Sequence, residues 1–296
     1  MEARSSDERR ARRVARDHAQ RRGRLAALGA LALIVAIVAL SLNQAAPAGG
    51  PSPPRPSTQQ GPPGASSQAA ADDKAIDDVL EYTPYVARGT RRRKELALTF
   101  DDGPGSSTPA LLRYLTTHDV PATFFLVGRA IGEHPDVVRR ESRAGFSLGT
   151  HTENHARLGS RTRADQSLEI LTAADRITQI SGHAVRLFRP PYGSFDATTL
   201  AVLHAERMLM ALWTVDTRDY AAPGPRPIVR AALDGARAGA VVLMHDGPGP
   251  RPSTLAALRT IVPALRRRGY RLVSLPTLLR DDPPPRHQRA PHSLAG

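Results

Sequence analysis

Short apolar runs of strand length alternate with longer segments of helical periodicity from about residue 95 to residue 280. The expected strands are residues 96–100, 122–127, 146–150, 185–188, 208–215, 240–244 and 270–275. Segments with a helical pattern lie between them, including residues 109–117, 164–180, 226–238 and 253–268. A regular alternation of strands and helices indicates a parallel sheet.

The number of these units sets the expected fold class. Seven strands in about 185 residues are too few for a complete eight-fold barrel, which typically takes about 250 residues. The pattern therefore predicts an α/β fold, a distorted or incomplete (β/α) barrel of about seven parallel strands. In such barrels the side chains that perform chemistry lie at the carboxyl ends of the strands.

The longest apolar run lies near the amino terminus, at residues 25–42, where Ser41 is the only polar residue. At ~1.5 Å per residue, a helix of this length nearly matches the ~30 Å hydrocarbon core of a bilayer. Nine Arg and four acidic residues precede the run, and the positive-inside rule then assigns residues 1–24 to the cytoplasm. We expect a transmembrane anchor at residues 25–43. A signal segment, left uncleaved or cleaved among the small residues 43–48, is the alternative.

Composition divides the rest of the chain. Residues 44–90 are rich in Pro, Gly and Ser at their start and are predicted to form a disordered linker that holds a domain away from the membrane. Residues 91–280 are the predicted folded domain. Residues 281–296 are the predicted disordered tail.

Charge and cysteine content narrow the range of possible metal ligands and binding partners. The chain has no Cys, so any metal must be held by His, Asp or Glu. Its formal net charge is +13, a balance that is typical of nucleic-acid binders. Within residues 95–280, however, 23 basic and 17 acidic residues are scattered without interleaved aromatic residues. We interpret them as a solvated surface and expect no nucleic-acid partner. Weak attraction to anionic wall polymers or lipid head groups is a secondary reading.

Candidate chemistry follows the first and third expected strands. The first ends in TFDDGP, and its adjacent carboxylates, Asp101 and Asp102, point in different directions, so one can bind a metal while the other takes a proton. An ordinary Asp-Gly turn is the alternative reading. The third strand ends in GTHTENH, where His151 and His155 can face one point if the chain turns helically. With Asp102 they would complete a two-His, one-carboxylate site that suits zinc or another divalent metal.

Three more segments end expected strands. The fourth strand runs into RPPYG, whose two prolines leave the Tyr192 N–H as the first free backbone donor after Arg189. The fifth carries WTVDTRDY, and the sixth ends in VVLMHDG, which places His245 at the same end of the sheet. Each segment alone is also compatible with a rigid loop or an exposed side chain.

Together the five segments resemble the motifs of the carbohydrate esterase family 4 polysaccharide deacetylases, the NodB homology domain. They stand in the family order and cover nearly all of residues 95–280. The resemblance implies a distorted β/α barrel, in agreement with the alternation of strands and helices.

The resemblance also implies a role for each catalytic position. Asp101 is expected to be the general base, held by charge pairing with Arg189. His245 is expected to be the general acid, with Asp219 as the carboxylate that orients it. The Tyr192 backbone N–H is expected to donate to the oxyanion.

Metal and pocket residues follow from the same resemblance. One divalent ion is expected at Asp102, His151 and His155, with zinc first and cobalt, manganese or nickel as alternatives. Leu243 is expected to line the pocket for the acetyl methyl group. The other expected pocket residues are Pro191, Trp213 and Tyr220. Tyr220 departs from the Trp that is usual in the family, which alters packing more than chemistry.

The implied reaction is the hydrolytic removal of N-acetyl groups from N-acetylglucosamine units of a cell-wall or chitin-like polysaccharide, with peptidoglycan first. An O-acetyl esterase of the xylan type and a non-catalytic polysaccharide-binding module are the alternatives. The expected partners are the polysaccharide and, through residues 25–43, the membrane. We expect the domain on the outer face of a bacterial cell membrane.

Overall fold

The computed structural model describes residues 65–286. The predicted basic segment at 1–24, the anchor at 25–43, the first part of the linker and the end of the tail lie outside the described residues. Among the helices that are described, none is both long and apolar enough to cross a bilayer.

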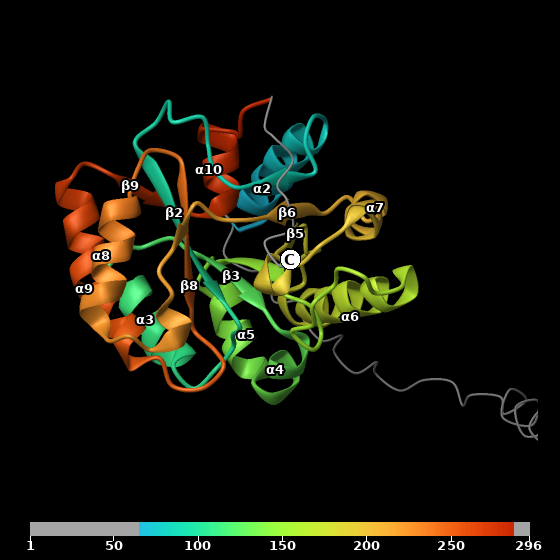
Figure 1. Cartoon of the computed structure of the whole chain (residues 1–296), viewed down its shortest axis with the longest axis horizontal. Coiled ribbons are helices and arrows are strands. Elements are labelled where there is room, and N and C mark those ends of the chain that lie inside the picture. Colours follow the sequence, from blue (N-terminus) through green and yellow to red (C-terminus); the bar gives the residue numbers. More distant parts are fainter. Residues whose placement is uncertain (1–64, 287–296) are drawn as a thin grey trace, which may run out of the picture. The chain divides into compact units, whose positions relative to one another are not determined.

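The described strands form one parallel sheet, and helices cover its outer face (Figure 1). Its strands are β1 (Tyr85–Val86), β2 (Glu95–Asp101), β3 (Thr123–Leu126), β4 (Ser147–Thr150), β5 (Leu187–Phe188), β6 (Leu209–Ala211), β7 (Val215–Asp216), β8 (Ala240–His245) and β9 (Arg271–Val273). Their order is β1-β6-β5-β4-β3-β2-β8-β7, and β9 pairs with β2. The order ends at β1 and β7 without closing, so the predicted α/β fold with an incomplete parallel barrel is confirmed, with nine described strands in place of the predicted seven.

The helices of the described region connect and cover these strands. They are α2 (Ala65–Leu80), α3 (Thr108–Thr117), α4 (Gly128–Glu133), α5 (Pro135–Arg143), α6 (Arg163–Ser181), α7 (Ala197–Ala205), α8 (Pro225–Gly235), α9 (Pro252–Arg267) and α10 (Leu275–Asp281). Local signals set their ends. The Thr162 side chain accepts the Asp165 N–H at the start of α6, and Gly182, with φ of 77°, ends that helix.

One predicted strand is two strands in the structure. The apolar run at residues 208–215 forms β6, which pairs with β5 and β1, and β7, which pairs with β8. Only residues 212–214 separate them, so the two ends of the sheet approach each other and the sheet must curl. A continuous apolar run cannot distinguish one buried strand from two short ones, which is why the sequence did not predict the break.

The central strand β2 is buried on both faces, as expected for a parallel sheet. Leu96, Leu98 and Phe100 pack in one cluster with the apolar sides of the outer helices. Ala97 belongs to a second cluster, which includes Phe125 and residues of α2 and α10. Side chains alternate along a strand, so Thr99 and Asp101 share the face of Ala97. This inner face is therefore apolar near the start of β2 and polar at its carboxyl end.

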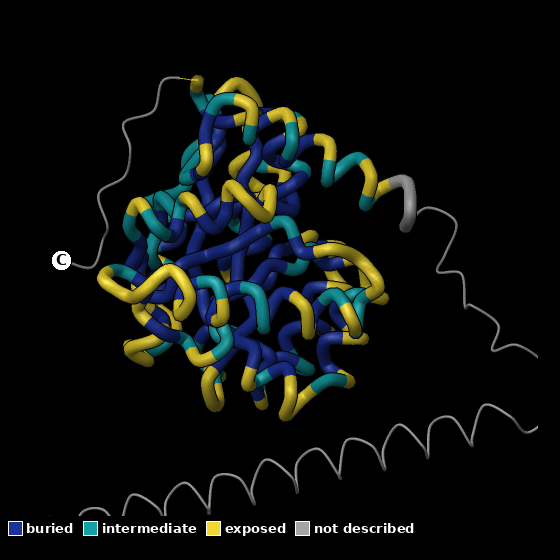
Figure 2. Tube along the Cα trace, turned by 90° about the vertical axis from the view of Figure 1, so that its right-hand side faces the viewer, coloured by how far each residue is buried: buried dark blue, intermediate teal, exposed yellow. Residues whose placement is uncertain are grey.

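The folded unit extends beyond the predicted boundaries at both ends. Residues 65–80 of the predicted linker form α2, which packs beside α10 and buries Ala75, Ile76 and Val79 in the inner-face cluster (Figures 1 and 2). Asp282, assigned to the tail, is fully buried and accepts the Arg91 N–H at 2.9 Å. The linker prediction depends on Pro and Gly content, which ends before α2 begins, whereas the buried apolar residues of α2 have helical spacing.

Burial of α2 predicts a stability effect that a linker would not show. Ile76→Ala should lower the free energy of unfolding of the purified protein by about 2–5 kcal/mol, because it leaves a cavity between α2 and the sheet. Urea denaturation measures this change. Lys74→Ala, at an exposed position of the same helix, should shift stability by no more than about 0.5 kcal/mol. Equal, negligible effects of both substitutions would mean that α2 is not part of the core.

Candidate active site

The polar residues expected to perform chemistry meet at the carboxyl ends of β2, β4, β5 and β8. The parallel register of β2 and β8 sets Asp101 directly opposite His245. Thr150, the last residue of β4, pairs with Phe188, the last residue of β5. His151 and Arg189 therefore leave neighbouring strands at the same level of the sheet.

Asp102, His151 and His155 form a compact cluster, with one ligand atom from each within 4.8 Å of the others. The Nε2 atoms of His155 and His151 lie 3.0 Å and 3.6 Å from Asp102 Oδ1. Nδ1 of His151 is 2.7 Å from the Arg189 carbonyl oxygen and donates to it, which leaves its Nε2 lone pair free to bind a cation.

Protonation in the cluster also suits a cation. Burial lowers the pKa of His151, so the imidazole stays neutral and keeps its lone pair. Burial works against an ionised Asp102, but the neighbouring imidazoles outweigh it and lower the pKa of that carboxyl. Asp102 Oδ1 is buried and has no well-formed hydrogen bond, although two imidazole nitrogens face it. The two imidazole nitrogens and this unsatisfied carboxylate oxygen form a ligand set that fits one divalent cation.

Strained backbone conformations occur at these strand ends. The non-glycine residues Asp102, Thr152, His155 and Tyr192 have φ values of 72°, 66°, 56° and 59°. Such left-handed conformations are costly for residues with a Cβ and persist where the surrounding structure imposes them. They turn the chain sharply after β2, β4 and β5. Residues 151–155 form no helix, so the helical turn predicted after His151 is wrong, although His151 and His155 do meet.

Asp101 forms a buried ion pair with Arg189. Nη1 of Arg189 donates to Asp101 Oδ1 at 2.7 Å and to Thr99 Oγ1 at 2.8 Å, and Nε donates to the Ala211 carbonyl at 3.1 Å. The guanidinium also lies 4.1 Å from the centre of the Phe125 ring. Burial lowers the pKa of Arg189, and the charge of Asp101 opposes this effect. The pair fixes one Asp101 oxygen and leaves the other, Oδ2, 3.8 Å from His151 Nε2.

His245 and Asp219 form a second buried pair. Asp219 Oδ1 accepts from His245 Nδ1 at 2.8 Å, and Asp219 Oδ2 accepts from the His245 backbone N–H at 2.9 Å. Thr254 and Thr217 also donate to this carboxylate, at 2.7 Å and 3.1 Å. Burial acts against the imidazolium, but the hydrogen bond and charge of Asp219 outweigh it and raise the pKa of His245. Burial acts to raise the pKa of Asp219, but the hydrogen bonds and charge of His245, together with the hydrogen bond from Thr254, outweigh it and lower that pKa.

Aromatic side chains flank these two pairs. Tyr192 and Tyr220 are each 51% exposed, and their rings pack edge-on against His155 and His245 at centroid distances of 4.7 Å and 5.4 Å. The Tyr192 backbone N–H makes no hydrogen bond within residues 65–286. The remaining expected pocket residues are also close: Leu243 is buried two residues before His245, Pro191 is buried before Tyr192, and the half-buried Trp213 ring lies 5.8 Å from the Arg189 guanidinium.

Sequence reasoning overlooked several supporting residues. The hydroxyls of Thr99, Thr217 and Thr254 each hold a charged site residue. Asp246 lies behind the Asp101–Asp102 turn, where its N–H donates to the Asp101 carbonyl at 3.1 Å. A Cβ at Gly103 would lie 2.3 Å from Asp246 Oδ2, so any larger residue here would have to displace the buried Asp246 carboxylate. Burial raises the pKa of the Asp246 carboxyl to about 7. Thr99 could have been found from its spacing two residues before Asp101, on the same strand face.

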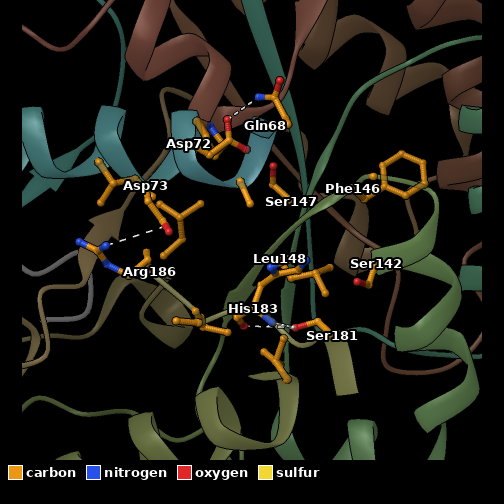
Figure 3. A pocket seen from close by; sticks show the side chains of 18 residues that line it. Gln68, Asp72, Asp73, Ser142, Phe146, Ser147, Leu148, Ser181, His183 and Arg186 are labelled. Carbon is orange, nitrogen blue, oxygen red and sulfur yellow. Dashed lines mark hydrogen bonds and ion pairs between the residues drawn. The ribbon is translucent and has the colours of Figure 1, made fainter. Parts of the chain in front are cut away.

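A separate cavity of about 190 Å³ lies at the other end of the sheet, where β4 and β5 begin and α2 crosses them (Figure 3). Several of its polar side chains have partners. Asp72 accepts from Gln68 at 2.7 Å, and Arg186 lies 3.9 Å from Asp73 and also pairs with Asp77. This amino-terminal end of the strands serves stability in β/α barrels. The chemistry of the described residues is therefore at the carboxyl ends.

Known proteins with similar sequences and folds show the family to which the chain belongs. The model of the polysaccharide deacetylase family matches residues 88–210. The chitooligosaccharide deacetylase of Azorhizobium caulinodans is 38% identical over 204 residues, which are 64% of this chain and 97% of that protein. The chain therefore belongs to the polysaccharide deacetylase family, as its motifs indicated, and it is a hydrolase.

Solved structures agree with this assignment. The Bc1960 peptidoglycan N-acetylglucosamine deacetylase is similar with a TM-score of 0.66 and 31% identity, over 70% of this chain and 97% of that one. BA3943 of Bacillus anthracis, described as a family pseudoenzyme, is similar with a TM-score of 0.63 and 30% identity, over 67% and 69% of the two chains. A shared fold alone therefore does not establish catalysis, which has to be inferred from the side chains of the site.

The His245–Asp219 pair yields a prediction for titration. Asp219→Asn removes the charge that raises the pKa of His245, so that pKa should fall, and the imidazolium should be lost at lower pH than in the wild type. NMR titration of the His245 ring measures the change. Asp216→Asn is the matched control, because the Asp216 carboxylate accepts from the Arg218 N–H and makes no contact with His245. An unmoved His245 titration in the Asp219 variant would show that Asp219 does not tune it.

Proposed function

We propose that the protein is a metal-dependent N-deacetylase that removes acetyl groups from N-acetylglucosamine units of peptidoglycan and releases acetate. One observation carries this proposal. Asp101 and His245, a base and an acid held by separate buried partners, stand opposite each other in the β2–β8 register beside a cluster of three potential metal ligands. Hydrolysis of an amide needs a base for the water and an acid for the leaving amine, on either side of the carbonyl.

The side chains divide the reaction between them. A divalent ion held by Asp102, His151 and His155 would polarise the acetamide carbonyl and make a bound water more acidic. Asp101, oriented by Arg189, takes the proton of the attacking water. The unpaired Tyr192 N–H donates to the oxyanion that develops. His245, protonated and oriented through Nδ1 by Asp219, gives its Nε2 proton to the leaving amine. Leu243 and Trp213 surround the acetyl methyl group.

Zinc is the ion we propose, because the ligand set has two imidazoles and one carboxylate and leaves positions open for water and substrate. Peptidoglycan is the proposed polymer because relatives act on it and because the basic amino terminus and apolar run would hold the domain on the wall side of a membrane.

Metal content and turnover should separate the two neighbouring carboxylates. Asp102→Ala should lose the bound ion, whereas Asp101→Asn and His245→Ala should keep it and each lose about 10²-fold or more of acetate release. Elemental analysis and acetate release from peptidoglycan, chitin oligomers and acetylated xylan measure the two properties. Chelation should abolish activity and leave the fold intact, because the scaffold does not depend on the ion.

Two results would contradict the proposal. Full activity in a rigorously metal-free sample would remove the metal from the mechanism. Loss of the ion in Asp101→Asn, with proportionate activity when metal is restored, would mean that the two carboxylates have the opposite roles. Acetate release from acetylated xylan alone would indicate an O-acetyl esterase, and binding without release from any polymer would indicate a non-catalytic module.

The proposed topology has its own test. Protease added to intact spheroplasts should remove the catalytic domain, since residues 1–24 would lie inside and residues 44–296 outside. A domain that stays fully protected until the cells are lysed would contradict this orientation. Recovery of only a soluble species that begins near Ala46 would indicate a cleaved signal segment in place of an anchor.

A further inference from the structure

One side of the candidate active site carries a cation that the reaction above does not use. Arg157 follows the proposed metal ligand His155 by two residues, and its guanidinium carbon lies 4.2 Å from the centre of the Tyr192 ring. That ring packs edge-on against His155 at 4.7 Å. A single aromatic ring therefore separates the Arg157 charge from a proposed metal ligand.

The charge of Arg157 is not neutralised by the protein. Arg157 is exposed and forms no ion pair with any carboxylate of residues 65–286. Carboxylates on the neighbouring segments have other partners: Glu153 pairs with Arg176 at 3.1 Å, Asp165 accepts from Thr162 at 2.7 Å, and Asp196 caps α7. Arg161 adds a second charge that has no carboxylate partner among the described residues. It lies near Arg157, since its Nε donates to the Arg157 carbonyl at 2.6 Å.

The position of the guanidinium suits an anionic ligand. Stacking on Tyr192 holds the planar group without using its hydrogen-bond donors, which remain available in the fork geometry that matches a carboxylate. The stacking partner is half-exposed and packs against the proposed metal ligand His155, at the edge of the candidate active site. A sugar next to the acetamide being hydrolysed would pass over this edge, so a carboxylate on that sugar could reach Arg157.

We infer that Arg157, with Arg161 behind it, forms a carboxylate-binding subsite beside the deacetylation site. The subsite would favour glycans with acid substituents next to the N-acetylglucosamine unit over neutral N-acetylglucosamine chains. This inference rests on the proposed function and specifies the chemistry of its substrate. A neutral chitin-like chain has no group for Arg157 to bind, whereas an N-acetylmuramic acid unit without a stem peptide has a free lactyl carboxylate with the required charge.

The test compares two substrates that differ only in charge. One is an oligomer of alternating N-acetylglucosamine and N-acetylmuramic acid, and the other is the same oligomer with its lactyl carboxyls converted to amides. The wild type should have a kcat/KM about threefold to tenfold higher for the acidic oligomer, the range expected of a partly exposed charge-assisted hydrogen bond. High salt should reduce this ratio. Arg157→Gln should bring it close to one, and Arg157→Lys should retain part of it.

Controls separate the subsite from a general loss of function. Arg267→Gln, at an exposed position at the end of α9 and at the other end of the strands, should keep the wild-type ratio. Calorimetric binding of both oligomers to the Asp101→Asn variant, alone and combined with Arg157→Gln, measures the preference without turnover. A binding preference that Arg157→Gln removes supports the subsite even if no acetate is released, an outcome that would reject only the deacetylase assignment. No preference in the wild type, or an equal loss on both oligomers, would overturn the inference.

Discussion

The buried Arg189 guanidinium is the constraint on which the site depends. It is fully enclosed and donates to four residues: to Asp101 and Thr99 of β2, to Ala211 of β6 and, at 3.4 Å, to the Leu212 carbonyl beyond β6. Its own carbonyl accepts from His151 Nδ1. Breaking a buried ion pair by removing one partner typically costs 3–5 kcal/mol, so the base and a potential metal ligand are positioned by a contact that the fold cannot readily lose.

The inner face of the barrel has an apolar end and a polar end, and the buried charge lies at the polar end. At the amino ends of the strands the inner face is apolar and is covered by α2 and α10. At the carboxyl ends it carries Thr99, Asp101 and Arg189, whose polar atoms satisfy one another. The strained residues after β2, β4 and β5 lie at that same end, where the rest of the barrel can hold them in place.

The sequence predicted the strand ends well because each apolar run stops at a polar motif, and parallel strands bring those motifs to one edge. It could not predict register, so the direct opposition of Asp101 and His245 came only from the structure. Helix α2 was not predicted, because the Pro and Gly content of the segment outweighed the helical spacing of its apolar residues. Strands β6 and β7 were predicted as one strand, because an apolar run has no internal boundary. A count of arginines over the whole domain cannot distinguish Arg157, which stacks on Tyr192, from a solvated surface charge.

Environment, more than residue type, distinguishes the two buried histidines whose roles differ most. His151 has its Nδ1 bonded to a neutral carbonyl, and burial lowers its pKa, so it remains an uncharged ligand. His245 has its Nδ1 bonded to the carboxylate of Asp219, which overcomes burial and raises its pKa, so it can carry a proton. Groups whose pKa values are moved apart by their surroundings commonly have separate roles in catalysis. The partner of each Nδ1 atom therefore assigns the chemistry of each ring, and that partner is set by strand register.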